Sequence, residues 1–193
     1  MTILIIGLVI FLGVHSLGFL APGGRQGLID RLGNNGWQGL AGLVALAGLV
    51  LIVWGYGQAR VAPVPLFAPP VWTRHLGLLV MLPAFPLFFA AYLPGRIKAA
   101  VGHPMLTAVI LWALAHLLAN GNLADLVLFG AFLIWALADR ISLFFRVAPP
   151  VQGAPPGKAN DLIAIVLGLA FYLGFLFWAH AWLFGVSPLG LDH

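Results

Sequence analysis

Six apolar segments, each about as long as a lipid bilayer is thick, make up most of this chain. A helix of about 20 apolar residues crosses the roughly 30 Å hydrocarbon layer of a membrane, and only helices and closed barrels satisfy their backbone hydrogen bonds there. We therefore predict an all-α fold: a polytopic integral membrane bundle of about six transmembrane helices, forming one domain over residues 1–193. The expected spans are residues 2–21, 37–58, 74–93, 104–120, 123–146 and 161–186. Pro83 and Pro86 should kink the third span.

The composition excludes several classes of protein. Charged residues are 7% of the chain, against roughly 25% in soluble domains, and hydrophobic residues are 62%, so a water-soluble globule is excluded. The chain has no cysteine, which excludes disulfides, thiolate-bound iron–sulfur clusters and covalent haem attachment through cysteine. The net charge of +4 comes from basic residues scattered over several loops. Such scattering makes a poor phosphate-binding surface, so we expect no nucleic acid partner.

The basic residues predict the orientation of the bundle, because short cytoplasmic loops are enriched in Lys and Arg. An N-terminus outside the cell makes the first, third and fifth loops cytoplasmic. These three loops and their approaches contain Arg25, Arg31, Arg96, Lys98, Arg140, Arg146 and Lys158, whereas the outer loops contain Arg60 and Arg74. We therefore expect a multi-pass protein of a bacterial inner membrane with both termini in the periplasm. The apolar N-terminal segment has no basic residues before it, so we interpret it as a span and not a cleaved signal.

The segment from Gly102 to Asn122 contains the main candidate for a functional residue. Pro104 suits the first position of a helix and His103 the capping position before it. Within the predicted helix 104–120, Trp112, His116 and Asn120 recur every four residues and therefore share one face. An ionisable side chain inside a membrane span is costly unless it faces protein, a cavity or a ligand. His116 is therefore a candidate site residue, with Trp112 and Asn120 beside it.

His15 is the second candidate. It lies about 13 residues, or roughly 18–20 Å, into the first span, and His116 lies roughly 18 Å into an oppositely directed span. The two depths differ by only about 6–8 Å in a 30 Å layer. Two imidazoles near the midplane suit axial ligation of a haem iron, although two separately hydrogen-bonded histidines fit the same pattern. His103 and His116 are about 20 Å apart along one helix and cannot bind one iron together.

The other histidines receive no site role. His75 and His180 lie close to tryptophans near the predicted outer ends of their spans, which indicates an interfacial position. His193 is the last residue, and we expect it to be disordered. A small-metal site would need three or four ligands from histidines at discordant depths, whereas haem needs one or two protein ligands. The ligand types therefore favour haem.

The first span contains Val14-His15-Ser16, and a later run leads from Gly102 to Leu106 into Leu111 to Gly121. Together these motifs resemble the NnrU family. The length and span pattern also fit, so the resemblance covers most of the chain. The family is similar to the haem-dependent zeta-carotene isomerase of plants and cyanobacteria. The resemblance implies a haem b protein in which His15 and His116 bind the iron, and in which His103 is a further histidine of the motif.

The resemblance leaves two functions open. The first is a cis–trans isomerase that converts the central cis double bond of a polyene, such as 15-cis-zeta-carotene, to trans through histidine-ligated iron, with His15 and His116 as catalytic residues. The second is an accessory role in denitrification, without catalysis, that supports nitric oxide or nitrite reductase. The expected partners are the lipid bilayer, an apolar polyene and a redox partner for the iron. A small transporter is disfavoured because the predicted mid-membrane segments contain no acidic residue. The oligomeric state and the substrate's identity remain open.

Overall fold

The apolar segments form α-helices in the computed structural model, which describes residues 1–147, 151 and 153–190. Within these residues there is no β-strand, and one isolated bridge joins Pro65 to Asn122. The helices group into two compact units. Unit 1 comprises residues 1–68 and 120–147, and unit 2 comprises residues 69–119 and 148–193. The all-α prediction is therefore confirmed, and we describe each unit by itself.

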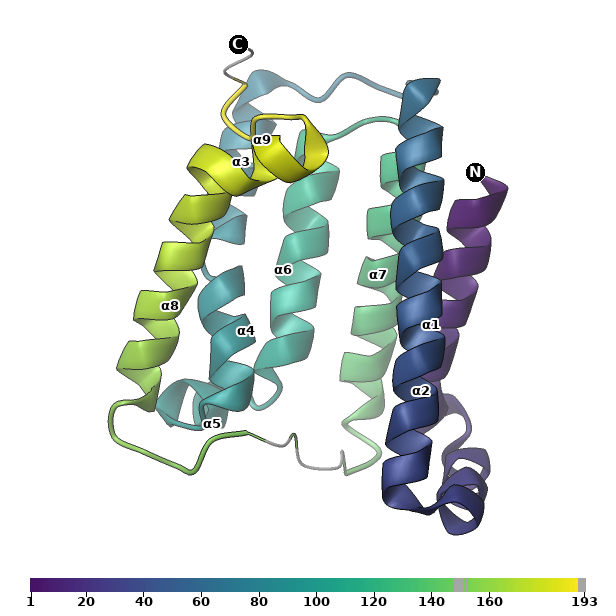
Figure 1. Ribbon diagram of the computed structural model, residues 1–193. Coiled ribbons are helices and arrows are strands. Elements are labelled where there is room, and N and C mark those ends of the chain that lie inside the picture. The colour runs from purple at the N-terminus through teal and green to yellow at the C-terminus, as the bar shows by residue number, and fades with distance from the viewer. Residues whose placement is uncertain (148–150, 152, 191–193) are drawn as a thin grey trace. The chain divides into compact units, whose positions relative to one another are not determined.

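Unit 1 contains the helices α1 (Thr2–Leu20), α2 (Pro22–Val61) and α7 (Leu123–Ser142) (Figure 1). Glycines let α1 and α2 approach closely. A Cβ atom at Gly55 would lie 2.3 Å from the backbone nitrogen of Leu4, and one at Gly48 would lie 2.7 Å from that of Phe11. Helices associate in lipid largely through such close backbone packing at small residues.

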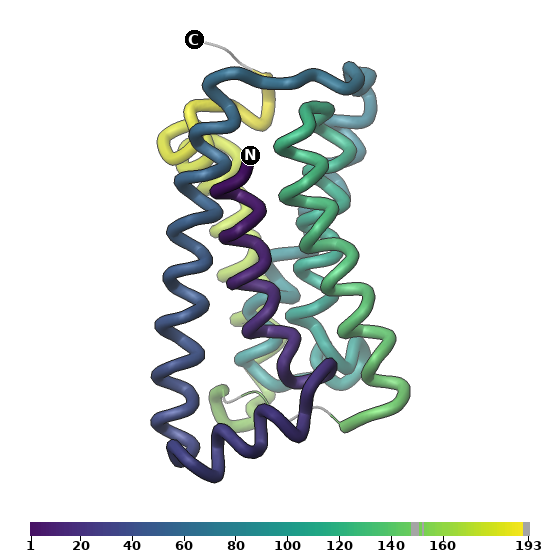
Figure 2. The backbone as a smooth tube through the Cα atoms, turned by 90° about the vertical axis from the view of Figure 1, so that its right-hand side faces the viewer, coloured from purple at the N-terminus to yellow at the C-terminus, as the bar shows by residue number. Residues whose placement is uncertain are grey.

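The first predicted loop, residues 22–36, is helical in the structure, and this part of the prediction is wrong. Pro22 occupies the start of α2, and the helical ribbon continues to Val61 across a break at Gly33, where φ is 71° and ψ is 166°. Figure 2 shows the segment before this break running at an angle to the long remainder of α2. Only glycine adopts such a positive φ readily, so Gly33 sets the change of direction.

A buried carboxylate joins α2 to the start of α7. Asp125 is 3% exposed and accepts a hydrogen bond of 2.5 Å from the hydroxyl of Tyr56 on α2. The same carboxylate accepts the backbone N–H of Asn122 at 3.2 Å and the side-chain amide of Asn122 at 3.0 Å. These bonds form a capping box, which satisfies backbone donors at the helix start.

Unit 2 contains the remaining helices. They are α3 (Val71–Met81), α4 (Ala84–Tyr92), α5 (Arg96–Val101), α6 (Pro104–Ala119), α8 (Asn160–Gly174), the π-helix η1 (Phe175–Ala179) and α9 (His180–Phe184). The predicted kink in the third span is confirmed, because the chain is interrupted between α3 and α4 at Leu82 and Pro83. Proline lacks the N–H that a continuous helix needs and collides with the preceding turn.

Small residues and polar caps hold unit 2 together. A Cβ atom at Gly77 of α3 would lie 2.8 Å from the carbonyl oxygen of Ala115, so α3 and α6 are in close backbone contact beside His116. The carboxylate of Asp161 accepts the backbone N–H groups of Arg96 at 2.8 Å and of Ile97 at 3.0 Å. Asp161 therefore caps α5 from the first turn of α8, where an acidic side chain also suits the helix dipole.

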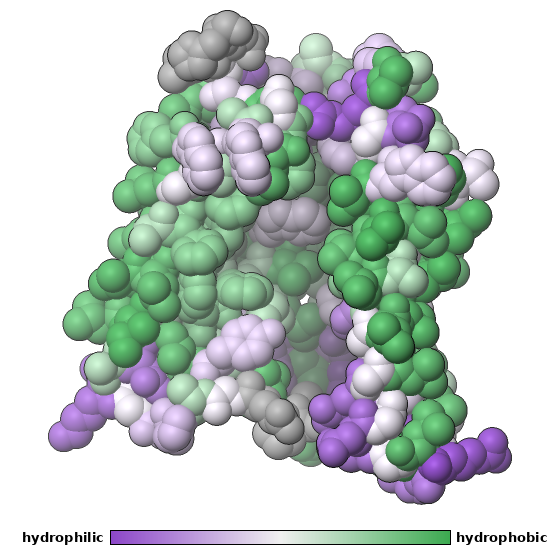
Figure 3. Space-filling model, in the orientation of Figure 1, coloured by the Kyte–Doolittle hydropathy of each residue, from purple (hydrophilic) through white to green (hydrophobic). Residues whose placement is uncertain are grey.

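Among the residues that the structure describes, four helical segments are long and apolar enough to cross a membrane: Thr2–Leu20, Pro22–Val61, Val71–Tyr92 and Asn160–Phe184. The helix α6 is apolar but has only 16 residues, and α7 has 20 residues but includes Asp125, Asp139 and Arg140. Apolar side chains dominate the outward surfaces of α2 and α8 in Figure 3, and polar side chains gather near the helix ends. The length and apolar composition of these helices are those of a membrane protein. The count of six spans stays a prediction.

Candidate functional site

His116 lies in the last turn of α6, three residues before the helix ends at Ala119. Its side chain is half-buried, and its Nδ1 lies 2.8 Å from the carbonyl oxygen of Trp112, one turn earlier. The two rings also pack together, with centroids 5.3 Å apart. Both the predicted spacing and the shared face of Trp112 and His116 are confirmed. A carbonyl oxygen can only accept a hydrogen bond, so Nδ1 carries the proton and the lone pair of the ring lies on Nε2.

His180 is the first residue of α9 and follows directly after the π-helix Phe175–Ala179. Its Nδ1 lies 2.7 Å from the carbonyl oxygen of Val186, so this ring also carries its proton on Nδ1. Val186 can reach back to His180 because α9 ends at Gly185, which adopts a left-handed conformation with φ of 68°. The ring of Phe184 packs edge-on against His180, with centroids 5.0 Å apart.

The structure brings His116 and His180 together within unit 2. Their ring centroids are 6.3 Å apart, and the ring planes differ by 24°. Figure 1 shows α6 and α8 running in the same direction, so the end of α6 and the start of α9 lie at the same end of this unit. Sequence reasoning missed this neighbour because it interpreted His180 as interfacial. The only signal was that both histidines lie shortly before a helix-ending glycine, Gly121 or Gly185.

His15 lies on α1 in unit 1 and is exposed in the structure. Its Nδ1 lies 2.7 Å from the carbonyl oxygen of Phe11, and the ring of Trp135 on α7 approaches edge-on with centroids 6.1 Å apart. The neighbouring Ser16 accepts a hydrogen bond of 3.2 Å from the indole N–H of Trp135. Because His15 and His116 belong to different units, their predicted pairing on one iron stays a prediction.

The other two predicted site residues, His103 and Asn120, flank α6, and the two remaining histidines lie elsewhere. His103 precedes α6, and its carbonyl oxygen accepts the N–H of Thr107 at 3.2 Å, so it occupies the predicted capping position. Asn120 follows the last residue of α6 and belongs to unit 1. The observed helix therefore ends one residue before the predicted end, since Gly121 follows closely. His75 is exposed on α3, and His193 lies outside the residues that the structure describes.

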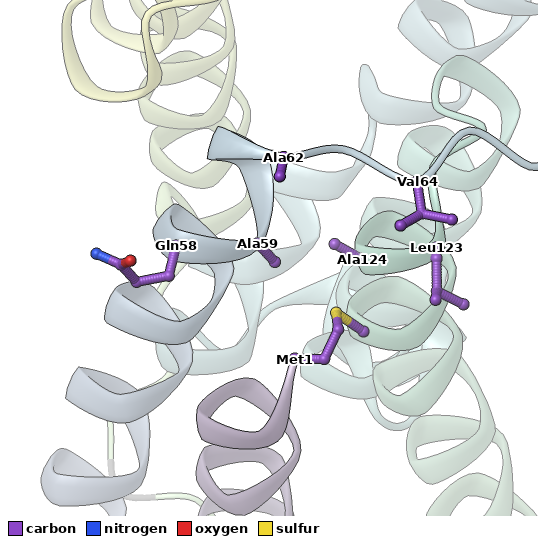
Figure 4. Close-up of a pocket in the computed structure, with 7 residues that line it drawn as sticks. All are labelled: Met1, Gln58, Ala59, Ala62, Val64, Leu123 and Ala124. Carbon is purple, nitrogen blue, oxygen red and sulfur yellow. The ribbon is translucent and has the colours of Figure 1, made fainter.

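Two hollows occur in unit 1, and neither is lined by a candidate histidine. The first has a volume of about 220 Å³ and is lined by Met1, Gln58, Ala59, Ala62, Val64, Leu123 and Ala124. Figure 4 shows the side chain of Met1 pointing toward Leu123 and Ala124. The second is an apolar groove of about 350 Å³ between α1 and α7, which reaches Ser16, the residue beside His15. Neither hollow therefore presents an imidazole to a metal.

A family model described as NnrU protein matches residues 3–188. The chain belongs to the NnrU family. The match runs through both units and confirms the resemblance drawn from the Val14-His15-Ser16 and Gly102-His103-Pro104 motifs. Comparison with curated proteins and with solved structures finds no significant match.

Three of the six histidines of this NnrU-family protein share one hydrogen-bonding pattern. In His15, His116 and His180 the Nδ1 atom lies 2.7–2.8 Å from a backbone carbonyl oxygen. A histidine that binds a metal typically donates its other ring N–H to a carbonyl or carboxylate, which fixes the tautomer and orients the ring. Among the residues that the structure describes, no three or more His, Cys, Asp or Glu side chains form a metal-binding group. Haem fits this donor set because its porphyrin supplies the equatorial ligands and the protein adds one or two imidazoles.

Proposed function

We propose that this NnrU-family membrane protein binds haem b through His116 and acts as a polyene cis–trans isomerase similar to 15-cis-zeta-carotene isomerase. The observation that carries the proposal is the hydrogen bond of 2.8 Å between His116 Nδ1 and the carbonyl oxygen of Trp112, since a metal-binding histidine typically donates its other ring N–H to such a carbonyl. The sequence motif names His15 as the second ligand, and its Nδ1 makes the same type of bond to Phe11.

Each named residue has a role in this proposal. His116 would hold the iron, and the ring of Trp112 packs on His116 and limits its rotation. Haem held by His116 would supply an iron that can exchange an electron with a polyene, which would weaken the cis double bond. No acid or base is needed for that chemistry. The apolar helices suit a long apolar substrate that enters from the bilayer. The predicted inner-membrane location and periplasmic termini remain part of the proposal.

The visible absorption spectrum of the purified protein tests the cofactor. The full chain is expressed with haem supplied, purified in detergent, and measured oxidised and then reduced with dithionite. We expect a sharp Soret band and the split reduced-state bands of a low-spin b-type haem. His116→Ala should lose most of the bound haem, whereas Leu114→Ala, two residues away on α6, should keep it. A folded wild-type protein without these bands would overturn the proposal.

The enzymatic part needs a separate assay. Cells that accumulate the central-cis polyene should convert it to the trans isomer when the protein is expressed with haem. The inactive control is His116→Ala. If wild-type protein binds haem and the isomer ratio stays the same, the accessory role in denitrification is favoured, because the matching family model is that of NnrU itself.

A further inference from the structure

We propose that His180, and not His15, is the second axial ligand of the iron bound by His116. This inference rests on the proposed haem binding and names the second ligand of that site. It assigns a role to a residue that the family motifs do not include. Both ligands then lie in unit 2, so the site requires no side chain from unit 1.

The separation of the two rings supports this assignment. A histidine nitrogen lies about 2 Å from a bound metal, and the centre of an imidazole ring lies about 1 Å beyond that nitrogen. Two imidazoles on opposite sides of one iron therefore have centroids about 6 Å apart. The centroids of His116 and His180 are 6.3 Å apart, and their planes are nearly parallel at 24°.

The hydrogen bonds of both rings point to the same role. His116 Nδ1 bonds to Trp112 O, and His180 Nδ1 bonds to Val186 O, so both rings carry the metal-binding lone pair on Nε2. Each ring also packs against an aromatic neighbour, Trp112 or Phe184, which restricts its rotation. Rings held in this way lose less conformational entropy when they bind a metal.

The backbone around His180 also departs from a regular helix. The π-helix Phe175–Ala179 ends at the residue before His180. Such π-helical turns are rare in proteins, and those that occur are often found at functional sites. After α9, the left-handed Gly185 turns the chain so that the Val186 carbonyl meets His180 Nδ1. Two local irregularities therefore flank His180 and fix the direction of its ring.

The test compares four single variants of the full chain loaded with haem b: His180→Gly, His15→Gly, His75→Gly and His116→Gly. The readouts are the haem content per protein and the reduced absorption spectrum, with and without added imidazole. We expect His180→Gly to keep haem but to change from a six-coordinate low-spin spectrum to a five-coordinate high-spin spectrum. Added imidazole should restore the low-spin spectrum, because it replaces the missing ring. His75→Gly, the exposed histidine of the same unit, should behave as wild type.

The outcomes separate this inference from the proposed function. A wild-type protein that takes up no haem overturns both. If the wild type binds haem, a six-coordinate spectrum in His180→Gly together with its loss in His15→Gly overturns only the assignment to His180. His180→Gln, which keeps most of the side-chain volume, guards against misfolding: it should show the same spectral change and elute from gel filtration as wild type does.

Discussion

At the scale of single residues, the carboxylate of Asp125 is the clearest determinant of stability in unit 1. It is 3% exposed and binds both the Tyr56 hydroxyl and the capping donors of Asn122. We predict that Asp125→Ala lowers the free energy of unfolding by about 1–3 kcal/mol, because it leaves buried donors without an acceptor. The measurement is the thermal unfolding midpoint in detergent, followed through the fluorescence of the seven tryptophans.

The variant Tyr56→Phe provides the comparison for Asp125→Ala. It removes one hydroxyl and leaves the capping box intact, so its cost should be near 1 kcal/mol, the net value of one hydrogen bond. In the double variant the two costs should not add, because both include the bond between Tyr56 and Asp125. Equal unfolding midpoints for Asp125→Ala and wild type would show that the carboxylate does not hold the helices together.

At the scale of helices, the contact between α1 and α2 depends on Gly55. A Cβ atom there would lie 2.3 Å from the backbone nitrogen of Leu4, whereas a Cβ atom at Gly57 meets nothing within 4 Å. We predict that Gly55→Leu pushes the helices apart and costs about 1–3 kcal/mol or more, as overpacked cores do. Gly57→Leu, two residues along the same helix, should leave the unfolding midpoint near that of wild type. Similar midpoints for the two variants would contradict the close packing of α1 on α2.

The turn after α9 gives a second prediction for an element. Gly185 has a φ of 68°, and an L-residue with a side chain pays about 1–2 kcal/mol in that left-handed conformation. We predict that Gly185→Ala destabilises the turn and weakens the hydrogen bond between His180 Nδ1 and the Val186 carbonyl oxygen. A less firmly held His180 should broaden the Soret band of the haem-loaded protein. The control is Gly174→Ala, since Gly174 has a helical φ of −59° and open space around it. An unchanged spectrum in Gly185→Ala would show that this turn does not orient His180.

The sequence predicted the helices better than it predicted the site. Apolar length located the long helices, the prolines located the break before α4, and the spacing of Trp112 and His116 located their common face. His180, the neighbour of His116, was missed because the tryptophans beside it indicated an interfacial position. Apolar length also does not predict the irregular segments that bring the two histidines together. The short helix α5 and the turn at Gly102 precede α6, and η1 interrupts the regular rise toward His180.

At the scale of the whole molecule, the distribution of basic residues predicts the membrane orientation. The predicted cytoplasmic loops contain more Lys and Arg than the outer loops do, and this bias sets the orientation of multi-pass proteins. The structure places the basic residues Arg25 and Arg31 in the segment of α2 before its break at Gly33. A short helix with arginines suits a position along a membrane surface, where the side chains reach anionic headgroups.

Single cysteines measure this orientation directly, because the chain has no cysteine of its own. We predict that Ala68→Cys, an exposed position in the second loop, reacts with a membrane-impermeant maleimide in intact spheroplasts. Gln26→Cys and Lys158→Cys, which are also exposed, should react only after the membrane is permeabilised, because both positions are predicted to be cytoplasmic. The reverse pattern would show an inverted protein. Labelling of Gln26→Cys and Lys158→Cys from opposite sides would show that the number of spans between them is odd, which contradicts a bundle of six.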